Sequence, residues 1–258
     1  MKLIYFLLIL VSINCRLIPK PEKGKEGFFK FLSFRDTSSN LNVSSTQPKK
    51  DTTNIFLNTN IFVGFNRTLS AIDETNFSVI DESKIAHPGK ISINDNFLTF
   101  TPDSNFKEFT KYTISIKKET GLSGDFTFSF TTGNLIDSTP PSVISTSPSE
   151  GDKDFPLNAT VVFNFSETID PTSITSATFT ITGGILVDRT AEEQFASLKP
   201  KTNLAELSPY IVTIKAGVKD LAGNKSSAPY SILFSTGAKI SINNCKYDEG
   251  IYGECLFK

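Results

Sequence analysis

Two stretches in the second half of the chain carry residues whose types and spacing suit metal chemistry: Glu167 and Asp170 in "SETID", and Asp220 and Asn224 in "KDLAGN". Their carboxylate and amide oxygens are ligands that Ca²⁺ takes, and backbone carbonyls or water would complete its shell of about six to eight oxygens. In a simpler interpretation, Asp220 and Asn224 accept hydrogen bonds from backbone N–H groups of a turn, and Glu167 and Asp170 pair with Lys219 or water. We favour the turn and keep calcium as the alternative; no other cofactor is expected.

Acid–base and nucleophilic catalysis have few candidate residues in this chain. The single histidine, His87, stands beside a Pro-Gly pair that favours an exposed turn, and no cysteine or activated serine lies near it in the sequence. Glu167 and Asp170 are the types that glycosidases use in pairs, but the first half of the chain has no second such pair. We therefore expect no catalytic residues and no enzyme.

Internal duplication is the most specific feature of the sequence. The segment "IFLNTNIFVGFN" aligns with "FPLNATVVFNFS" one hundred positions later. The alignment continues further along the chain, where "YTISI" matches "YIVTI" and "FTFSFTTG" matches "YSILFSTG". Ordered matches across a whole period predict a tandem repeat of about 95 residues. We place the two repeats at 40–133 and 140–237, joined by a linker at 134–139.

Each repeat has the pattern of an immunoglobulin-like (fibronectin III-like) β-sandwich, so the predicted fold class is all-β. Short segments in which apolar and polar residues alternate are separated by Gly, Pro, Asn and Asp. Tyr112 and Tyr210 begin the penultimate strands, as the tyrosine of an immunoglobulin corner does, with Ile114 and Val212 where a bridging cysteine would stand. In the second repeat we expect strands at 143–148, 159–166, 177–182, 194–199, 210–215 and 230–236, and a weak strand near 185–188.

The second repeat resembles a known family. "PPSVISTSPSEGDKDFPLNATVVFNFSETID", followed by "AGVKDLAGN" and "LFSTG", is similar to the bacterial Ig-like domain first described in an S-layer protein. The resemblance implies that "SETID" ends strand B and "KDLAGN" follows strand F, so the two loops emerge at one end of the sandwich. The four candidate ligands should then approach one another. The first repeat has Arg67 and Ser70 at the matching positions, so a metal site is expected in the second alone.

The N-terminal residues 1–15, "MKLIYFLLILVSINC", predict an export signal. Lys2 is followed by an apolar run too short to span a bilayer as a helix. "VSINC" resembles a bacterial lipobox of the looser spirochaete type, which implies acylation of Cys15. The alternative is a cleaved secretory protein in which Cys15 has no role. Residues 16–39 would then form a tether, in which "GFFKFLSF" at 27–34 adds a strand to the first sandwich or lies in the membrane interface.

The C-terminal tail, residues 238–258, holds the other two cysteines. Cys245 and Cys255 form an even pair in an exported chain and predict a disulfide. A zinc site is the weaker alternative, because no second cysteine pair or nearby histidine is present.

These features predict a protein anchored by lipid in the bacterial cell envelope, in the outer membrane, on its surface or periplasmic face. We expect it to present two Ig-like modules for adhesion or ligand binding, with host or envelope proteins or polysaccharide as partners. The alternative is a structural or accessory role in the periplasm without a soluble ligand. The formal net charge of −1 gives no positive field, so nucleic acid is not expected as a partner.

Overall fold

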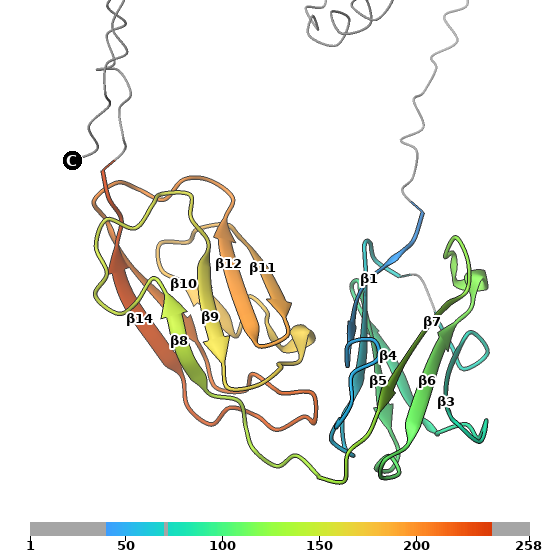
Figure 1. Ribbon diagram of the computed structural model, residues 1–258. Helices are drawn as coiled ribbons and strands as arrows, with labels where there is room; N and C mark the ends of the chain where they lie inside the picture. The colour runs from blue at the N-terminus through green and yellow to red at the C-terminus, as the bar shows by residue number, and fades with distance from the viewer. Residues whose placement is uncertain (1–39, 70–71, 239–258) are drawn as a thin grey trace, which may run out of the picture. The chain divides into compact units, whose positions relative to one another are not determined.

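The computed structural model describes residues 40–69 and 72–238, which form two β-sandwiches (Figure 1). In the first, a four-stranded sheet in the order β1-β2-β5-β4 faces a three-stranded sheet in the order β3-β6-β7, and every pairing is antiparallel. The strands are β1 (Val43–Gln47), β2 (Ile61–Phe65), β3 (Phe77–Asp81), β4 (Gly89–Asn94), β5 (Phe97–Pro102), β6 (Lys111–Ile116) and β7 (Phe126–Thr131).

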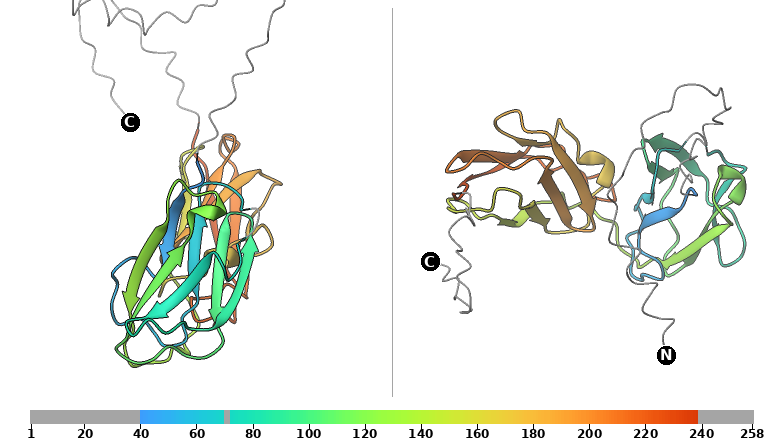
Figure 2. Two further views of the ribbon diagram at one scale, coloured as in Figure 1. Left: turned by 90° about the vertical axis from the view of Figure 1, so that its right-hand side faces the viewer. Right: turned by 90° about the horizontal axis from the view of Figure 1, so that it is seen from above.

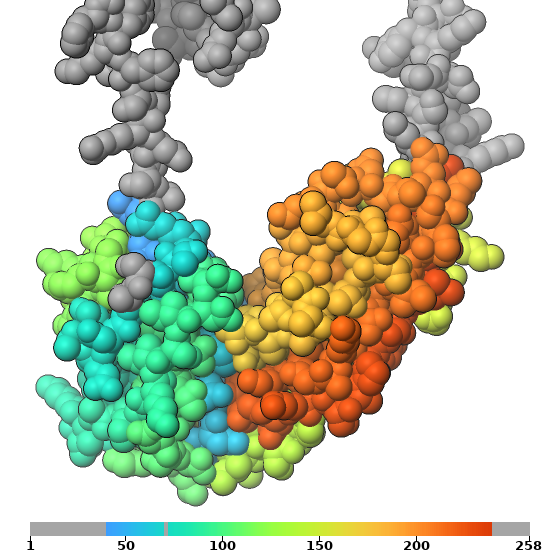
Figure 3. Space-filling view, turned by 180° about the vertical axis from the view of Figure 1, so that it is seen from behind, coloured from blue at the N-terminus to red at the C-terminus, as the bar shows by residue number. Residues whose placement is uncertain are grey.

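The second sandwich repeats this topology with sheets in the orders β8-β9-β12-β11 and β10-β13-β14. Its strands are β8 (Val143–Ser147), β9 (Val161–Phe165), β10 (Phe179–Ile181), β11 (Val187–Glu192), β12 (Phe195–Pro200), β13 (Pro209–Ile214) and β14 (Tyr230–Ser235). The space-filling view shows each sandwich in its own continuous range of colours, so neither exchanges strands with the other (Figure 3). The all-β prediction of two Ig-like sandwiches is confirmed.

The described residues contain only two helical elements, both short 3₁₀ turns: η1 (Lys118–Thr120) and η2 (Pro171–Ser173). No helix in this part of the chain has the length and apolar character needed to cross a membrane. The strands of the first sandwich run roughly along one axis, which is clearest in the turned view (Figure 2, left).

The alternation of side chains along each strand builds one core per sandwich. In β2, Ile61, Val63 and Phe65 are all fully buried, and Val161, Phe163 and Phe165 of β9 repeat this arrangement. Burying a phenylalanine side chain contributes about 1.5–3 kcal/mol. The chain has no tryptophan, and Phe and Tyr make most of the aromatic contacts in both cores.

Both predicted tyrosine corners are present. The hydroxyl Oη of Tyr112 accepts a hydrogen bond from the backbone N–H of Lys107 at 3.0 Å, and that of Tyr210 accepts one from Ala205 at 2.9 Å. Each bond ties the start of a strand to the loop before it, as in immunoglobulin domains. The rings are buried, and Tyr112 packs against Phe106 with the ring centroids 4.6 Å apart.

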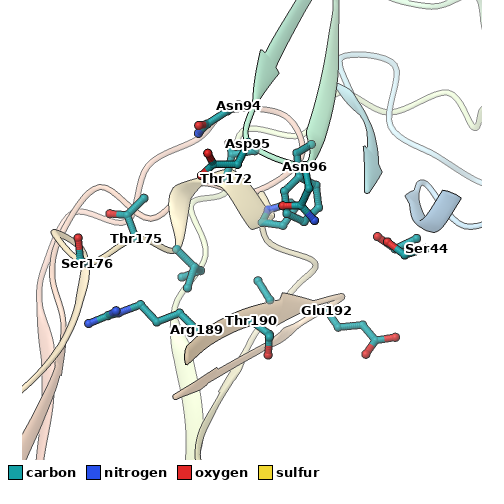
Figure 4. A pocket seen from close by; sticks show the side chains of 15 residues that line it. Ser44, Asn94, Asp95, Asn96, Thr172, Thr175, Ser176, Arg189, Thr190 and Glu192 are labelled. Atoms are coloured by element: carbon teal, nitrogen blue, oxygen red, sulfur yellow. The ribbon is translucent and has the colours of Figure 1, made fainter. Parts of the chain in front are cut away.

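The weak strand expected near 185–188 is instead the full strand β11, which pairs with β12 along six residues, Val187 to Glu192. Its pattern misleads because Arg189 occupies a half-buried, inward position that an apolar residue normally fills. The Arg189 Nε donates a 2.6 Å hydrogen bond to the carbonyl of Phe179 in β10, so it bridges the two sheets. Figure 4 shows the side chain running from β11 toward Thr175 and Ser176.

Candidate functional site: a carboxylate cluster beside the second sandwich

The loops that carry the predicted ligands meet at one end of the second sandwich. Ile169, in the loop after β9, forms an antiparallel bridge with Asp220, in the loop after β13. The backbone N–H of Asp170 also donates to the carbonyl of Lys219 at 2.7 Å. The two loops are therefore joined by their own backbones, which brings Glu167 and Asp220 together.

A third carboxylate, that of Asp137, completes the group. One oxygen from each of Asp137, Glu167 and Asp220 lies within 4.8 Å of one from each of the other two. Asp220 is 1% exposed and Asp137 8% exposed, whereas Glu167 is half-buried. Asp137 precedes the Pro140-Pro141 pair, and its Oδ1 accepts the backbone N–H of Thr139 at 3.0 Å. This short turn holds its carboxylate against the two loops.

Asp220 and Asn224 form a closed turn. The backbone N–H of Asn224 donates to Oδ1 of Asp220 at 2.9 Å, and its side-chain Nδ2 donates to Oδ2 at 2.8 Å. Between them Gly223 adopts a φ of 91°, a left-handed conformation that glycine takes without the steric cost of a Cβ. The same Nδ2 lies 3.3 Å from the carbonyl oxygen of Asp137. Asn224 thus gives hydrogen-bond donors to the cluster.

Asp170 does not belong to the cluster. Its Oδ1 accepts hydrogen bonds from the backbone N–H and the hydroxyl of Thr172, at 2.8 and 2.6 Å, and so caps η2. The Ser173 hydroxyl donates to the Asp170 carbonyl at 2.7 Å. Because its side chain is occupied at η2, Asp170 stabilises the local loop and contributes no ligand to the group of three.

Crowding of carboxylates shifts their proton affinity. Burial, together with the neighbouring charges of Asp137 and Asp220, raises the pKa of Glu167 to about 7. Burial also raises the pKa of Asp220, partly offset by its hydrogen bonds from Asn224. Like charges this close disfavour simultaneous ionisation. The cluster therefore favours a bound proton on Glu167, which reduces the excess negative charge.

The first sandwich has no matching group of acids among its described residues. Arg67 stands where Glu167 stands in the second repeat, and Ser70, the counterpart of Asp170, lies outside the described residues. His87, expected in an exposed turn, is half-buried on the ring of Phe106, with centroids 4.5 Å apart, and its Nε2 lies 2.9 Å from the Ser104 carbonyl oxygen.

Sequence reasoning missed Asp137 because it was assigned to the linker, outside the repeat. The available signal was an Asp two residues before Thr139 and three residues before the Pro140-Pro141 pair, a typical turn at the entry of a strand. The predicted acylation site Cys15, the Cys245–Cys255 pair and the segment 27–34 all lie outside the described residues.

Comparison with protein families gives one match, in two copies. The family model described as bacterial Ig-like domain matches residues 37–132 and 137–236. The second matched range includes Asp137 as well as Glu167 and Asp220, so all three members of the cluster fall in one repeat. A search of curated proteins gives no significant match.

Several solved structures resemble the chain at low identity. The titin domains Z1Z2 in complex with telethonin are 11% identical, with a TM-score of 0.26 over 79% of this chain and 98% of that one. The N-terminal part of the bacterial S-layer protein SbsC is 14% identical (TM-score 0.29; 76% and 44% covered). L,D-transpeptidase 3 from Mycobacterium tuberculosis is 11% identical (TM-score 0.29; 76% and 90%). Likenesses at this level carry no functional information.

Proposed function

Because the chain belongs to the bacterial Ig-like domain family, we propose that it is a lipid-anchored envelope protein that presents two Ig-like modules for adhesion or ligand binding at the cell surface. The observation that carries this proposal is a tandem pair of complete sandwiches that follows a hydrophobic N-terminal segment ending at Cys15. Domains of this kind present loops and strand edges to partners and need no catalytic centre. Host or envelope proteins or polysaccharide are the proposed partners.

The alternative proposal is a structural or accessory lipoprotein of the periplasm without a soluble ligand. Protease treatment of intact cells separates the two, because a surface protein is digested while a periplasmic one is protected by the outer membrane. We expect digestion, with a periplasmic protein as the internal control. Protection of the intact chain, followed by digestion after permeabilisation, would favour the periplasmic role.

The lipid anchor is tested independently of the face on which the protein lies. Mass spectrometry of the mature N-terminus should find an acylated, glyceryl-modified Cys15, and Cys15→Ala should move the protein from the membrane to the soluble fraction. An unmodified N-terminus elsewhere in the chain would contradict the anchor.

A further inference from the structure

After the last strand of the first sandwich, the chain runs parallel to the segment that leads into β2. Ile55 N–H donates to the Thr131 carbonyl at 3.2 Å, and the Ile55 carbonyl accepts Gly133 N–H at 2.8 Å. Leu57 N–H then donates to the Leu135 carbonyl at 2.9 Å. Evenly spaced bonds at every second residue are the ladder of a parallel strand pair. The linker is therefore bound to the first sandwich by its backbone.

A side chain makes the next step of this ladder. The Leu57 carbonyl would be the next acceptor, but it accepts the N–H of Phe106 at 2.7 Å instead. The side-chain amide of Asn58 takes its place: Oδ1 accepts the N–H of Asp137 at 2.9 Å, and Nδ2 donates to the Asp137 carbonyl at 2.8 Å. A side-chain amide offers the same donor and acceptor as a peptide group, so it binds both backbone groups of one residue whatever its side chain.

The second sandwich repeats the first two steps of the ladder. Phe155 N–H donates to the Ser235 carbonyl at 3.0 Å, and the Phe155 carbonyl accepts Gly237 N–H at 3.1 Å. The next donor is Leu157 N–H, which has no acceptor among residues 40–69 and 72–238. The Leu157 carbonyl accepts the N–H of Leu204 at 2.8 Å, so it is occupied in the same way as the carbonyl of its counterpart in the first sandwich.

Asn158 is placed to continue this ladder as Asn58 does. The two asparagines are one hundred positions apart, and each directly follows its leucine. Asn58 is half-buried, whereas Asn158 is exposed and forms no hydrogen bond within the described part of the chain. Leu57 is buried, whereas Leu157 is half-buried. The second sandwich therefore has the donor and the amide, but the described residues do not include a segment that binds them.

We propose that residues 239–241 of the C-terminal segment bind the second sandwich at Leu157 and Asn158, as the linker binds the first sandwich. The ladder fixes the register. Leu157 N–H donates to the carbonyl of Lys239, and the Asn158 amide pairs with the N–H and the carbonyl of Ser241. The described chain extends to residue 238, so the segment that binds is the one that follows directly.

The sequence of this segment is compatible because the contact involves only the backbone. In the linker, the side chains of Leu135 and Ile136 are 63% and 57% exposed, so they contribute little to the binding. The corresponding residues of the C-terminal segment are Lys239 and Ile240, and a lysine suits an exposed position. Ser241 is not a proline and so has the N–H that the contact requires.

Binding of this segment attaches the start of the C-terminal tail to the second sandwich. Cys245 follows Ser241 by four residues, so its Cα lies within about 14 Å of that of Ser241. The loop expected between Cys245 and Cys255 is then held beside this end of the sandwich. The inference goes beyond the proposed function and applies to either face of the membrane.

The test is amide hydrogen exchange of the full chain, measured at single residues by NMR. Leu157 N–H reports the contact, and Leu57 N–H, which donates to the linker, is the internal reference. In the natural chain we expect both amides to exchange at least about tenfold more slowly than an unprotected amide. Asn158→Ala removes the amide, and Ser241→Pro removes its donor. Each should accelerate the exchange of Leu157 at least about tenfold and leave Leu57 unchanged.

Ile240→Pro is the matched control. The N–H of its counterpart, Ile136, donates no hydrogen bond within the described residues, and the extended backbone that precedes a proline suits the ladder. Exchange of Leu157 should therefore stay slow in this variant. Leu204 N–H, which donates to the Leu157 carbonyl, should stay slow in every variant, because the sandwich itself remains folded.

An unprotected Leu157 N–H in the natural chain would overturn the proposal. Slow exchange that is lost in Asn158→Ala but kept in Ser241→Pro would also overturn it, because another segment would then occupy the site. Protection that grows with protein concentration would assign the site to a second copy, with the same consequence. Equal acceleration by Ile240→Pro and Ser241→Pro would contradict the role of the Ser241 donor and overturn the register.

Discussion

Asp220 binds Asn224 through both of its carboxylate oxygens, one accepting the backbone N–H and the other the side-chain amide, at 2.9 and 2.8 Å. This pair closes the loop after β13 and leaves Asp220 almost fully buried. The hydrogen bonds explain how an acid lies in a buried position next to Asp137 and Glu167. They also define what each substitution in the cluster should do.

Asn224→Ala should destabilise the second sandwich by about 1–2 kcal/mol, because it leaves one oxygen of a buried carboxylate without its donor. Denaturant unfolding monitored by a probe in the second sandwich measures the change. Asn134→Ala is a suitable control, since Asn134 is exposed and forms no hydrogen bond within the described residues, and it should change stability by less than about 0.5 kcal/mol. Equal effects of the two substitutions would contradict the role of the turn.

The second sandwich should lose stability as the pH rises from about 5 to 8. The folded state raises the pKa of Glu167 from the ordinary 4.5 to about 7, so between these values it binds more protons than the unfolded state. Stability is then greatest below the unfolded pKa and falls as pH rises through the folded pKa. Solvent screening of this partly exposed side chain limits the effect to about 1 kcal/mol.

Glu167→Gln should flatten this dependence and stabilise the second sandwich at pH 8, because the amide mimics the protonated acid. Thermal unfolding at pH 5.5 and pH 8 gives the comparison, with the exposed Glu206→Gln as control. A variant with the same pH slope as the natural chain would refute the assignment to Glu167.

Asp81 in the first sandwich acts in a separate pH range. The hydrogen bond from Lys107 lowers the pKa of Asp81, so the stabilisation by its carboxylate is lost only in stronger acid.

Calcium should leave the melting temperature of the second sandwich unchanged at millimolar concentration. In the arrangement described, Asp220 is already satisfied by Asn224, and Asp170 is occupied at η2. Calorimetric titration at pH 8, where the cluster is most ionised, is the most demanding test. Binding heat and a rise in melting temperature, both lost in Glu167→Gln, would establish the calcium site instead.

Tyr112→Phe and Tyr210→Phe should each cost about 1–2 kcal/mol, because each removes the acceptor of a loop N–H while preserving the buried ring. The loss should appear in the unfolding of the sandwich that carries the substitution. Tyr230→Phe is the control, since this side chain is 41% exposed and its hydroxyl has no hydrogen-bond partner within the described residues. A control as damaging as the corner variants would mean that the loss of stability does not come from the corner hydrogen bonds.

Cys245 and Cys255 should be oxidised to a disulfide in the exported protein. Thiol labelling of the denatured, unreduced chain is expected to modify neither residue, and reduction should expose both. The small loop predicts a local stabilisation of about 2–3 kcal/mol. Two reactive thiols before reduction would reject the bridge.

Much of the fold could be predicted because it depends on local periodicity. Apolar residues at every second position, such as Val161, Phe163 and Phe165 of β9, identify a strand from the sequence alone. The duplication then gave two copies of one sandwich, and Tyr112 and Tyr210 marked the same strand in each. Only β11 differed from this prediction, because Arg189 places a charge where the pattern expects an apolar side chain. Its guanidinium donates a hydrogen bond to a backbone carbonyl on the other sheet.

The sequence by itself determined that Glu167 and Asp220 follow strands whose loops emerge at one end of a sandwich. The tertiary structure decided which acids meet there: Asp137 enters from the segment before the sandwich, while Asp170 turns away to cap η2. It also decided that the Glu150 carboxylate caps the backbone N–H of Leu233 on the edge of β14. Strand formation follows from the burial pattern of neighbouring residues, whereas these contacts depend on where distant segments of the backbone pass one another.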